Sequence, residues 1–179
     1  MSTAAHMDVP DLVPAADHIR GPHDAPVRII EYGDFECPNC KQAAPTVALL
    51  LKRFAGRICV AYRHFPLEEV HPHALIAAEA AEAASEQGRF WEMHDRIFAS
   101  QPHLQLPHLR EMATELSLDM RRFSSALADH AHVAHIREDR EGGQRSGVRA
   151  TPTFFVNGKL CDVSFGMQVL ARAVEKALA

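Results

Sequence analysis

The apolar and polar positions of this chain switch between the period of strands and the period of helices. Residues 27–32 (Val-Arg-Ile-Ile-Glu-Tyr) are rich in β-branched and aromatic side chains, which is typical of a buried strand. Residues 42–54 carry apolar side chains at helical spacing, so we expect a helix that buries one face. Residues 57–64 again indicate a strand. The first 26 residues are interrupted by prolines and contain one short strand candidate, at 17–20.

The next stretch of the chain has the period of helices. We expect these helices at about residues 74–86, 90–100, 107–116, 120–128 and 132–141. In the first of them, Glu79, Glu82 and Glu86 form a polar stripe opposite small alanines, which implies close helix packing on the alanine side. Gly142 and Gly143 are expected to end or weaken the last of these helices.

After Gly147 the pattern returns to strands. Residues 153–156 lead into Asn157-Gly158, a dipeptide that favours a two-residue hairpin turn, and residues 159–161 begin the returning strand. A final helix is expected up to Leu178, with apolar residues on one face.

The order of elements is β-α-β, a helical insertion, then β-β-α, which predicts an α/β fold of the thioredoxin-like type with an inserted all-helical lobe. We expect the core to comprise residues 17–66 and 147–179, and the helical lobe residues 67–146. Residues 1–16 are expected to form an N-terminal extension. A chain of 179 residues suits one domain with such an insertion.

Composition excludes some classes of protein. The net charge is −4 and no long cluster of Lys and Arg occurs, which argues against a nucleic-acid partner. No apolar run approaches the roughly 18 residues of a membrane span, so no membrane partner is expected. Residues 1–8 lack the basic and apolar regions of a secretory signal. We therefore expect a cytoplasmic monomer, or a periplasmic one if a signal has been removed.

The candidate chemistry centres on Cys37-Pro38-Asn39-Cys40, between the first firm strand and its helix. A cysteine in that place lies at a helix N-terminus, where unpaired N–H groups and the helix dipole stabilise a thiolate. Such surroundings lower a cysteine pKa from about 8.5 to roughly 3.5–7.5. The pattern indicates disulfide exchange.

Cys59 and Cys161 each stand alone in apolar, strand-like surroundings and are expected to be buried structural thiols. In the expected sheet order two strands lie between theirs, which separates them by roughly 14 Å at ~4.8 Å per strand step. A disulfide requires Cα atoms within about 7 Å, so we expect no bridge between these two cysteines.

Five segments, in the same order, resemble the DsbA-like branch of the thioredoxin superfamily. They are residues 17–22, 31–40, 63–67, 88–94 and 147–154, which together reach along nearly the whole chain from residue 17. The resemblance implies a thiol–disulfide oxidoreductase that needs no metal or organic cofactor. Its substrates would be cysteine-containing proteins or small disulfides, and it would have a redox partner that the sequence does not identify.

The resemblance also implies residue roles. Cys37 would be the exposed attacking thiolate and Cys40 the buried resolving thiol of a redox-active pair. Pro152 would be cis and lie beside that pair, with the backbone of Thr151 free to pair with an extended substrate. Glu31 would be a buried acid whose raised pKa allows it to take the proton of Cys40. The other interpretation of Glu31 is an exposed glutamate at a sheet edge.

One departure from the family bears on the direction of electron flow. Strongly oxidising members have Pro-His between the cysteines, whereas this chain has Pro38 and Asn39. Asn39 carries no positive charge, and Asp34 and Glu36 place negative charge nearby, so Cys37 should be less acidic than in the strong oxidants. Since a less stable thiolate makes a weaker oxidant, the reductase, isomerase and oxidase directions stay open.

Three other classes of protein are alternatives to the oxidoreductase. A Cys-x-x-Cys can be half of a zinc site, but no second pair follows at zinc-ribbon spacing, and no metal is expected. A non-catalytic redox-sensing or chaperone-like module could use the same groove without turnover. A glutathione-dependent isomerase or transferase of the related branch would typically carry serine in place of Cys37.

The chain has 12 histidines, and two groups of them are close in sequence. These are His71 with His73, and His130 with His132 and His135. No acid or cysteine adjacent in sequence completes a ligand set, so solvated surface histidines are expected.

Overall fold

The structure is a computed structural model that describes residues 10–179. Of the expected N-terminal extension over residues 1–16, residues 1–9 lie outside the described residues. The division into core and lobe stays a prediction.

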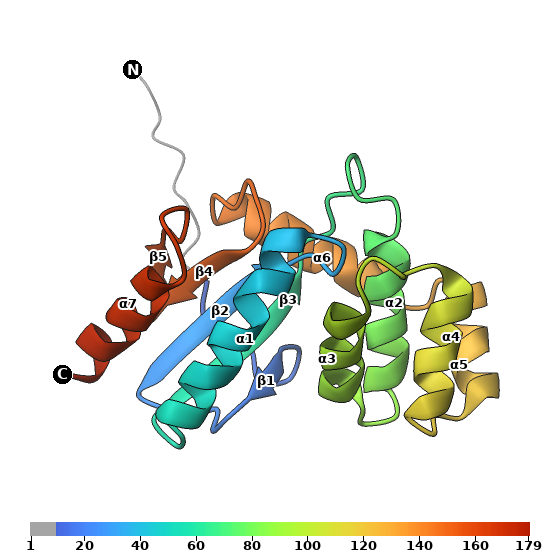
Figure 1. Ribbon diagram of the computed structural model, residues 1–179, viewed down its shortest axis with the longest axis horizontal. Helices are drawn as coiled ribbons and strands as arrows, with labels where there is room; N and C mark the ends of the chain where they lie inside the picture. The colour runs from blue at the N-terminus through green and yellow to red at the C-terminus, as the bar shows by residue number, and fades with distance from the viewer. Residues whose placement is uncertain (1–9) are drawn as a thin grey trace.

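A five-stranded mixed sheet forms the centre of the molecule (Figure 1). Its strands are β1 (His18–Arg20), β2 (Val27–Gly33), β3 (Ile58–His64), β4 (Thr153–Val156) and β5 (Lys159–Cys161). They lie in the order β1-β3-β2-β4-β5, with β2 and β3 parallel and the other pairs antiparallel. The near-continuous apolar run of β2 is explained by its central position, since both of its faces are covered.

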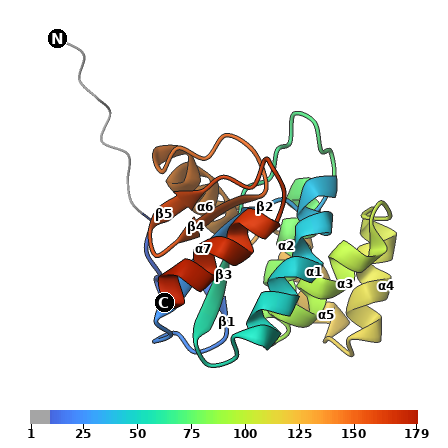
Figure 2. The same cartoon turned by 60° about the vertical axis from the view of Figure 1, so that its left-hand side comes forward.

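Helices cover both faces of the sheet. The helices α1 (Pro38–Arg53) and α7 (Gln168–Leu178) lie on one face, where they pack against the side chains of β2, β3 and β4 (Figure 2). The helix α6 (Val133–Arg145) lies on the opposite face, which carries Tyr32 and Phe155. Beside the sheet stands a group of helices formed by α2 (Ala74–Ser85), α3 (Phe90–Ser100), α4 (Leu106–Glu115) and α5 (Met120–Ala128) (Figure 1). We call this group the helical lobe.

The hairpin between β4 and β5 forms where the sequence indicated it. Asn157 has φ 47° and Gly158 has φ 75°, the two left-handed residues that a type I′ turn requires. This hairpin places Cys161 on β5, and β4 and β2 lie between β5 and Cys59 on β3, as expected.

One expected helix end is wrong. The helix α6 does not stop at Gly142 and Gly143 but continues to Arg145. A side chain at Gly143 would place a Cβ atom 2.8 Å from the ring of Phe65 and 2.9 Å from that of Tyr32. The glycine is there because the helix backbone approaches the sheet so closely that no side chain fits.

The polar stripe on α2 is also different from the expectation. Glu79 and Glu82 do not face solvent, since only 2% and 6% of their surfaces are exposed. The helix is enclosed by neighbours on its glutamate side as well as on its alanine side, and both carboxylates are paired with histidines from distant segments.

Candidate active site

Cys37 and Cys40 lie at the start of α1. Cys37 is the N-cap residue and Pro38 follows at the first helical position, where its missing N–H leaves no donor unsatisfied. Cys40, one turn further, faces the interior and is fully buried. The two thiols are free, and each has a different set of neighbours.

These neighbours shift the two thiol pKa values in opposite directions. The pKa of Cys37 is lowered to about 5, chiefly by a hydrogen bond with the Cys40 thiol, with further help from the backbone N–H groups of Asn39 and Cys40. Burial raises the pKa of Cys40 well above its ordinary value, and the negative charges of Cys37 and Glu31 add to that effect. The pair therefore holds one thiolate and one thiol at neutral pH.

Cys37 is less exposed than expected, with only 5% of its surface accessible. The reason is that two segments distant in sequence cover it. Its Sγ lies 3.4 Å from the carbonyl oxygen of Thr151, to which the thiol form of Cys37 donates a hydrogen bond. The side chain of Gln101 donates to the carbonyl oxygens of Phe35 and Cys37 from the other side.

Asp34 organises the loop before the cysteines, a role that the sequence analysis did not identify. Its buried carboxylate accepts hydrogen bonds from the backbone N–H groups of Glu36, Cys37 and Leu67 and from Nδ1 of His71. Its own backbone N–H donates to Sγ of Cys40 at 3.4 Å. Aspartate three residues before a helix N-cap is a common turn-former, and that signal could have indicated this role.

The expectation of solvated surface histidines is wrong for His71 and His73. His71 contacts Asp34 at 2.8 Å with its side chain 18% exposed, and His73 contacts Glu36 at 2.9 Å. Burial alone would lower the pKa of His71, but the hydrogen bond to Asp34 raises it above its ordinary value. Both acids of the loop before Cys37, Asp34 and Glu36, are thus hydrogen-bonded to a histidine.

Glu31 lies in the interior, which rules out the interpretation of an exposed residue at a sheet edge. It belongs to the central strand β2, opposite Tyr62 of β3 and Phe154 of β4, and is 4% exposed. Burial raises its pKa to about 8. A mostly apolar cavity of about 310 Å³, which also contacts Lys41 and Phe98, reaches Glu31.

Thr151 and Pro152 lie on the other side of the cysteine pair, in the loop before β4. The peptide bond between them is cis. A second pocket is lined by Asn39 and Gln42 of α1, by Thr151 and Pro152, and by Leu160, whose side chain is exposed. The fold therefore brings together all five residues named from the sequence, together with Asp34, His71 and Gln101.

Comparison with known protein families gives a match over most of the chain. A thioredoxin family model matches residues 15–176. A Na⁺/H⁺ antiporter of Salinispora arenicola is 50% identical over 166 residues, which are 93% of this chain and 25% of that protein. The chain spans about a quarter of the length of the curated relatives it matches.

These relatives overturn the expectation of a cytoplasmic protein. That expectation came from the start of the chain, but the sequence corresponds to one part of much longer proteins that are named as antiporters. The start of the chain is therefore no evidence about location. Within residues 10–179, we find no helix that combines the length and the apolar character of a membrane span.

Solved structures share the fold. The structure of oxidised BdbD from Bacillus subtilis has a TM-score of 0.83 and 23% identity, and the match covers 97% of this chain and 98% of that one. The thiol-disulfide exchange protein alpha-DsbA2 from Wolbachia pipientis has a TM-score of 0.79 and 19% identity, with 93% and 89% covered. The expected α/β thioredoxin-like fold is thus confirmed. The chain belongs to the thioredoxin family, and its fold is the one seen in these two solved structures.

Proposed function

We propose that this chain catalyses thiol–disulfide exchange with cysteine-containing proteins or small disulfides, with Cys37 as the nucleophile and Cys40 as the resolving thiol. The observation that supports this best is the opposite shift of the two thiol pKa values over one helical turn. A two-step exchange needs one cysteine that attacks as a thiolate and a second that stays protonated until it resolves the mixed disulfide.

In the reducing direction the Cys37 thiolate attacks one sulfur of a substrate disulfide. The substrate S–S bond breaks, a mixed disulfide forms at Cys37, and the other substrate sulfur leaves as a thiolate that takes up a proton. Cys40 then loses its proton and attacks Sγ of Cys37, which releases the second substrate thiolate. The enzyme is left with a Cys37–Cys40 disulfide, and its two electrons are on the substrate. The oxidising direction is the reverse.

The second step requires a base for the proton of Cys40, and we assign that role to Glu31. Cys40 is fully buried, and the charge of Glu31 is among the causes that raise its pKa, so the two groups interact. With a pKa of about 8, Glu31 is ionised in a fraction of the molecules near neutral pH, and this ionised form accepts the proton and can release it again. The cavity that reaches Glu31 is the route by which we expect this proton to reach solvent.

The pocket along Asn39, Pro152 and Leu160 is our proposed substrate groove. A segment lying in it would pass next to Cys37 and alongside the backbone of Thr151, which already contacts the reactive sulfur. An extended cysteine-containing peptide suits this shape, because backbone pairing needs no particular sequence.

The Cys37 pKa of about 5 also supports a proposal on redox potential. It lies between the values of roughly 3.5 for DsbA and roughly 7 for thioredoxin. We therefore propose a potential between about −270 and about −120 mV, which equilibration with glutathione buffers of known ratio would measure. A value outside these limits would contradict the link between the Cys37 pKa and the potential.

Cysteine variants test the enzyme itself. With catalytic amounts of protein and a disulfide-bonded substrate, Cys37→Ser should abolish turnover, and Cys40→Ser should accumulate mixed disulfides on non-reducing gels. Cys59→Ser is the matched control, since its thiol is buried on β3 and lines neither of the two pockets beside the pair. Substrate binding that is unchanged in both active-site variants, without turnover by the wild-type protein, would instead support the non-catalytic binding module.

A further inference from the structure

A second cluster of reactive side chains lies where the lobe meets the sheet. One carboxylate oxygen of Glu82, on α2, is 2.5 Å from Nε2 of His18 and 2.6 Å from Nε2 of His64. Nε2 of His135, on α6, is 3.8 Å from the same oxygen. His18 is the first residue of β1 and His64 the last of β3, so four elements meet at one atom.

The three imidazole rings are arranged almost symmetrically. Their centroids are 6.2 Å apart for His18 and His64, 6.2 Å for His18 and His135, and 6.3 Å for His64 and His135. The ring planes are inclined by 74°, 87° and 86° to one another. Phe90 stacks on the His18 ring with centroids 3.5 Å apart, which fixes that ring's orientation. Three imidazoles that point their Nε2 atoms at one centre have the arrangement of ligands around an ion.

We propose that His18, His64 and Glu82 bind a divalent transition-metal ion of the Zn²⁺ class, with His135 or water as the fourth ligand. Imidazole nitrogen and carboxylate oxygen are ligands that Zn²⁺ accepts, at about 2.0–2.2 Å. One donor atom from each of the three residues already lies within 4.8 Å of the others. Ligand atoms of a tetrahedral zinc site are roughly 3.3 Å apart at these bond lengths, so side-chain shifts of under about 1 Å are sufficient.

Binding replaces the protons that now hold the cluster together. A carboxylate oxygen only accepts hydrogen bonds, so His18 and His64 each donate an Nε2 proton to Glu82. When a metal ion enters, both rings bind through the unprotonated Nε2 atom. Two carboxylates then balance the charge of the ion, namely the buried Glu82 and the partly buried Asp139, whose Oδ2 is 4.0 Å from Nε2 of His135. Net charge therefore does not oppose the ion.

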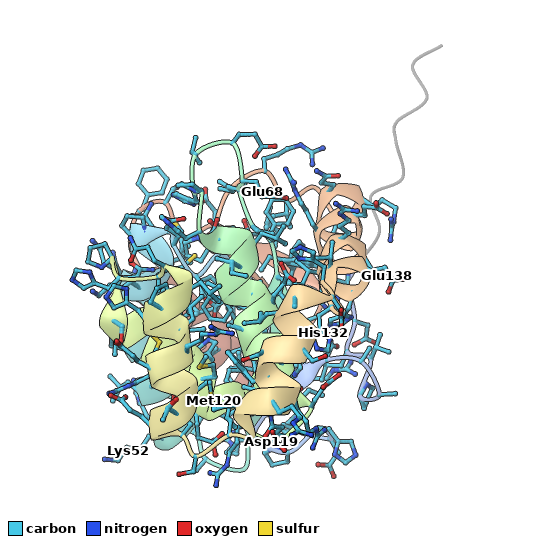
Figure 3. All side chains as sticks on the ribbon, turned by 90° about the vertical axis from the view of Figure 1, so that its right-hand side faces the viewer. Lys52, Glu68, Asp119, Met120, His132 and Glu138 are labelled. Atoms are coloured by element: carbon cyan, nitrogen blue, oxygen red, sulfur yellow. The ribbon has the colours of Figure 1, made fainter. Side chains whose placement is uncertain are left out.

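The site has a way in from solvent. A surface hollow is lined by residues 15–18 together with Glu82, Ser85 and His135. Figure 3 faces the lobe and labels His132 at the start of α6, one turn before His135. The Nδ1 atom of His64 is buried without a hydrogen-bond partner among the described residues. This ligand thus lacks the outer contact that usually orients a metal-bound histidine, and such contacts contribute 10–100-fold in affinity. We expect micromolar binding.

The ion would fasten the lobe to the sheet, because its ligands come from β1, β3, α2 and α6. No cysteine takes part, so the proposal is independent of the thiol chemistry. A metal titration of the oxidised protein, in which Cys37 and Cys40 form a disulfide, excludes these two cysteines as ligands. We expect calorimetry to give one Zn²⁺ per chain, and Co²⁺ to give the visible bands of a nitrogen- and oxygen-ligated ion without sulfur charge transfer.

Variants locate the site. Glu82→Gln keeps the shape and removes the charge, and we expect affinity to fall at least about 100-fold, since loss of an outer contact alone costs 10–100-fold. His135→Ala should weaken binding about tenfold or more. His130→Ala is the matched control, because His130 pairs with Glu79 on the same helix outside the cluster, and we expect a change of less than about twofold.

Three results would overturn the proposal. One is the absence of metal binding by the oxidised protein at millimolar Zn²⁺ and Co²⁺. Another is wild-type affinity in both Glu82→Gln and His135→Ala. The third is binding only in the reduced protein, which would identify the cysteines as the ligands. If Glu82→Gln does not fold, two measurements still test the proposal. They are the metal affinity of His135→Ala, whose native side chain is only partly buried, and the Co²⁺ spectrum of the wild-type protein.

Discussion

The sheet buries Glu31 and the lobe buries Glu82, and these two glutamates are ionised in opposite ways. Glu31 in β2 is 4% exposed and Glu82 in α2 is 6% exposed. Burial raises the pKa of Glu31 to about 8. Burial would raise the pKa of Glu82 as well, but hydrogen bonds from His18 and His64 hold it well below the ordinary range. Equal burial thus leaves Glu31 protonated and Glu82 charged near neutral pH, because only Glu82 has hydrogen-bond donors that stabilise its carboxylate.

This difference separates two uses of a buried acid. Glu31 exchanges a proton in the proposed reaction and therefore needs a pKa near neutrality. Glu82 keeps its charge at all ordinary pH values and holds segments of the chain together, or holds an ion. Substitutions at the buried glutamates and their partners test this difference, because they affect stability and activity in different ways.

The largest effect is expected from Glu82→Ala. The substitution leaves His18 and His64 without their acceptor, and removal of one partner from a buried ion pair typically costs about 3–5 kcal/mol. Urea unfolding at pH 7 would measure this loss in the free energy of unfolding. Glu86→Ala serves as the control, since Glu86 is 43% exposed and its pair with His132 should contribute at most about 1 kcal/mol. A loss below about 1 kcal/mol for Glu82→Ala would mean that the cluster does not stabilise the fold.

Glu31→Gln should have the opposite effect on stability. The unfolded chain releases this carboxyl proton near pH 4.5, whereas the folded chain keeps it up to about pH 8. Unfolding therefore releases a proton between these values, and the stability of the wild-type protein falls as pH rises from 4.5 to 8. The variant has no such fall, so at pH 9 it should be more stable than wild type by on the order of 2–4 kcal/mol.

The comparison is best made on oxidised protein, because the thiols then do not titrate. At pH 4, below both pKa values of Glu31, wild type and Glu31→Gln should differ by less than about 1 kcal/mol. Equal stabilities at pH 4 and pH 9 would show that the pKa of Glu31 is close to that of an ordinary glutamate.

Much of the fold could be predicted from local pattern. The strand at 27–32 and the helices at 90–100 and 120–128 occur within one residue of their expected bounds, because periodicity and turn residues are properties of neighbouring positions. The exception at Gly142-Gly143 is instructive. The helix passes through both glycines, and at Gly143 the rings of Phe65 and Tyr32, far away in sequence, leave no room for a side chain.

The functional residues also separate into those that local sequence indicates and those whose partners are distant in sequence. The spacing of Cys37 and Cys40 is local, and the sequence indicated it. The pairing of Glu82 was missed because its partners lie 64 and 18 residues away, at His18 and His64. The role of His71 was missed for the same reason, since Asp34 is 37 residues earlier. A glutamate's charge depends on such contacts, so its position in a periodic pattern does not predict whether it is exposed, protonated or paired.

A smaller effect is expected on the reaction rate of Glu31→Gln. Glutamine cannot accept the Cys40 proton, so resolution of the mixed disulfide should slow by about tenfold or more. The attack by Cys37 precedes this proton transfer and should change by less than about twofold. Stopped-flow measurement of single turnovers separates the two steps. If both steps keep their wild-type rates, Glu31 is not the proton acceptor.

The smallest effect is expected from His130→Ala, which tests a third buried glutamate on the same helix. Glu79 is as enclosed as Glu82, but its partner His130 has a side chain that is 68% exposed. Loss of an exposed partner opens Glu79 to water, which solvates the carboxylate in place of the imidazole. The free energy of unfolding should therefore fall by no more than about 1 kcal/mol, as for other exposed pairs. A loss as large as that of Glu82→Ala would show that burial of the glutamate, and not of its partners, decides the cost of breaking such a pair.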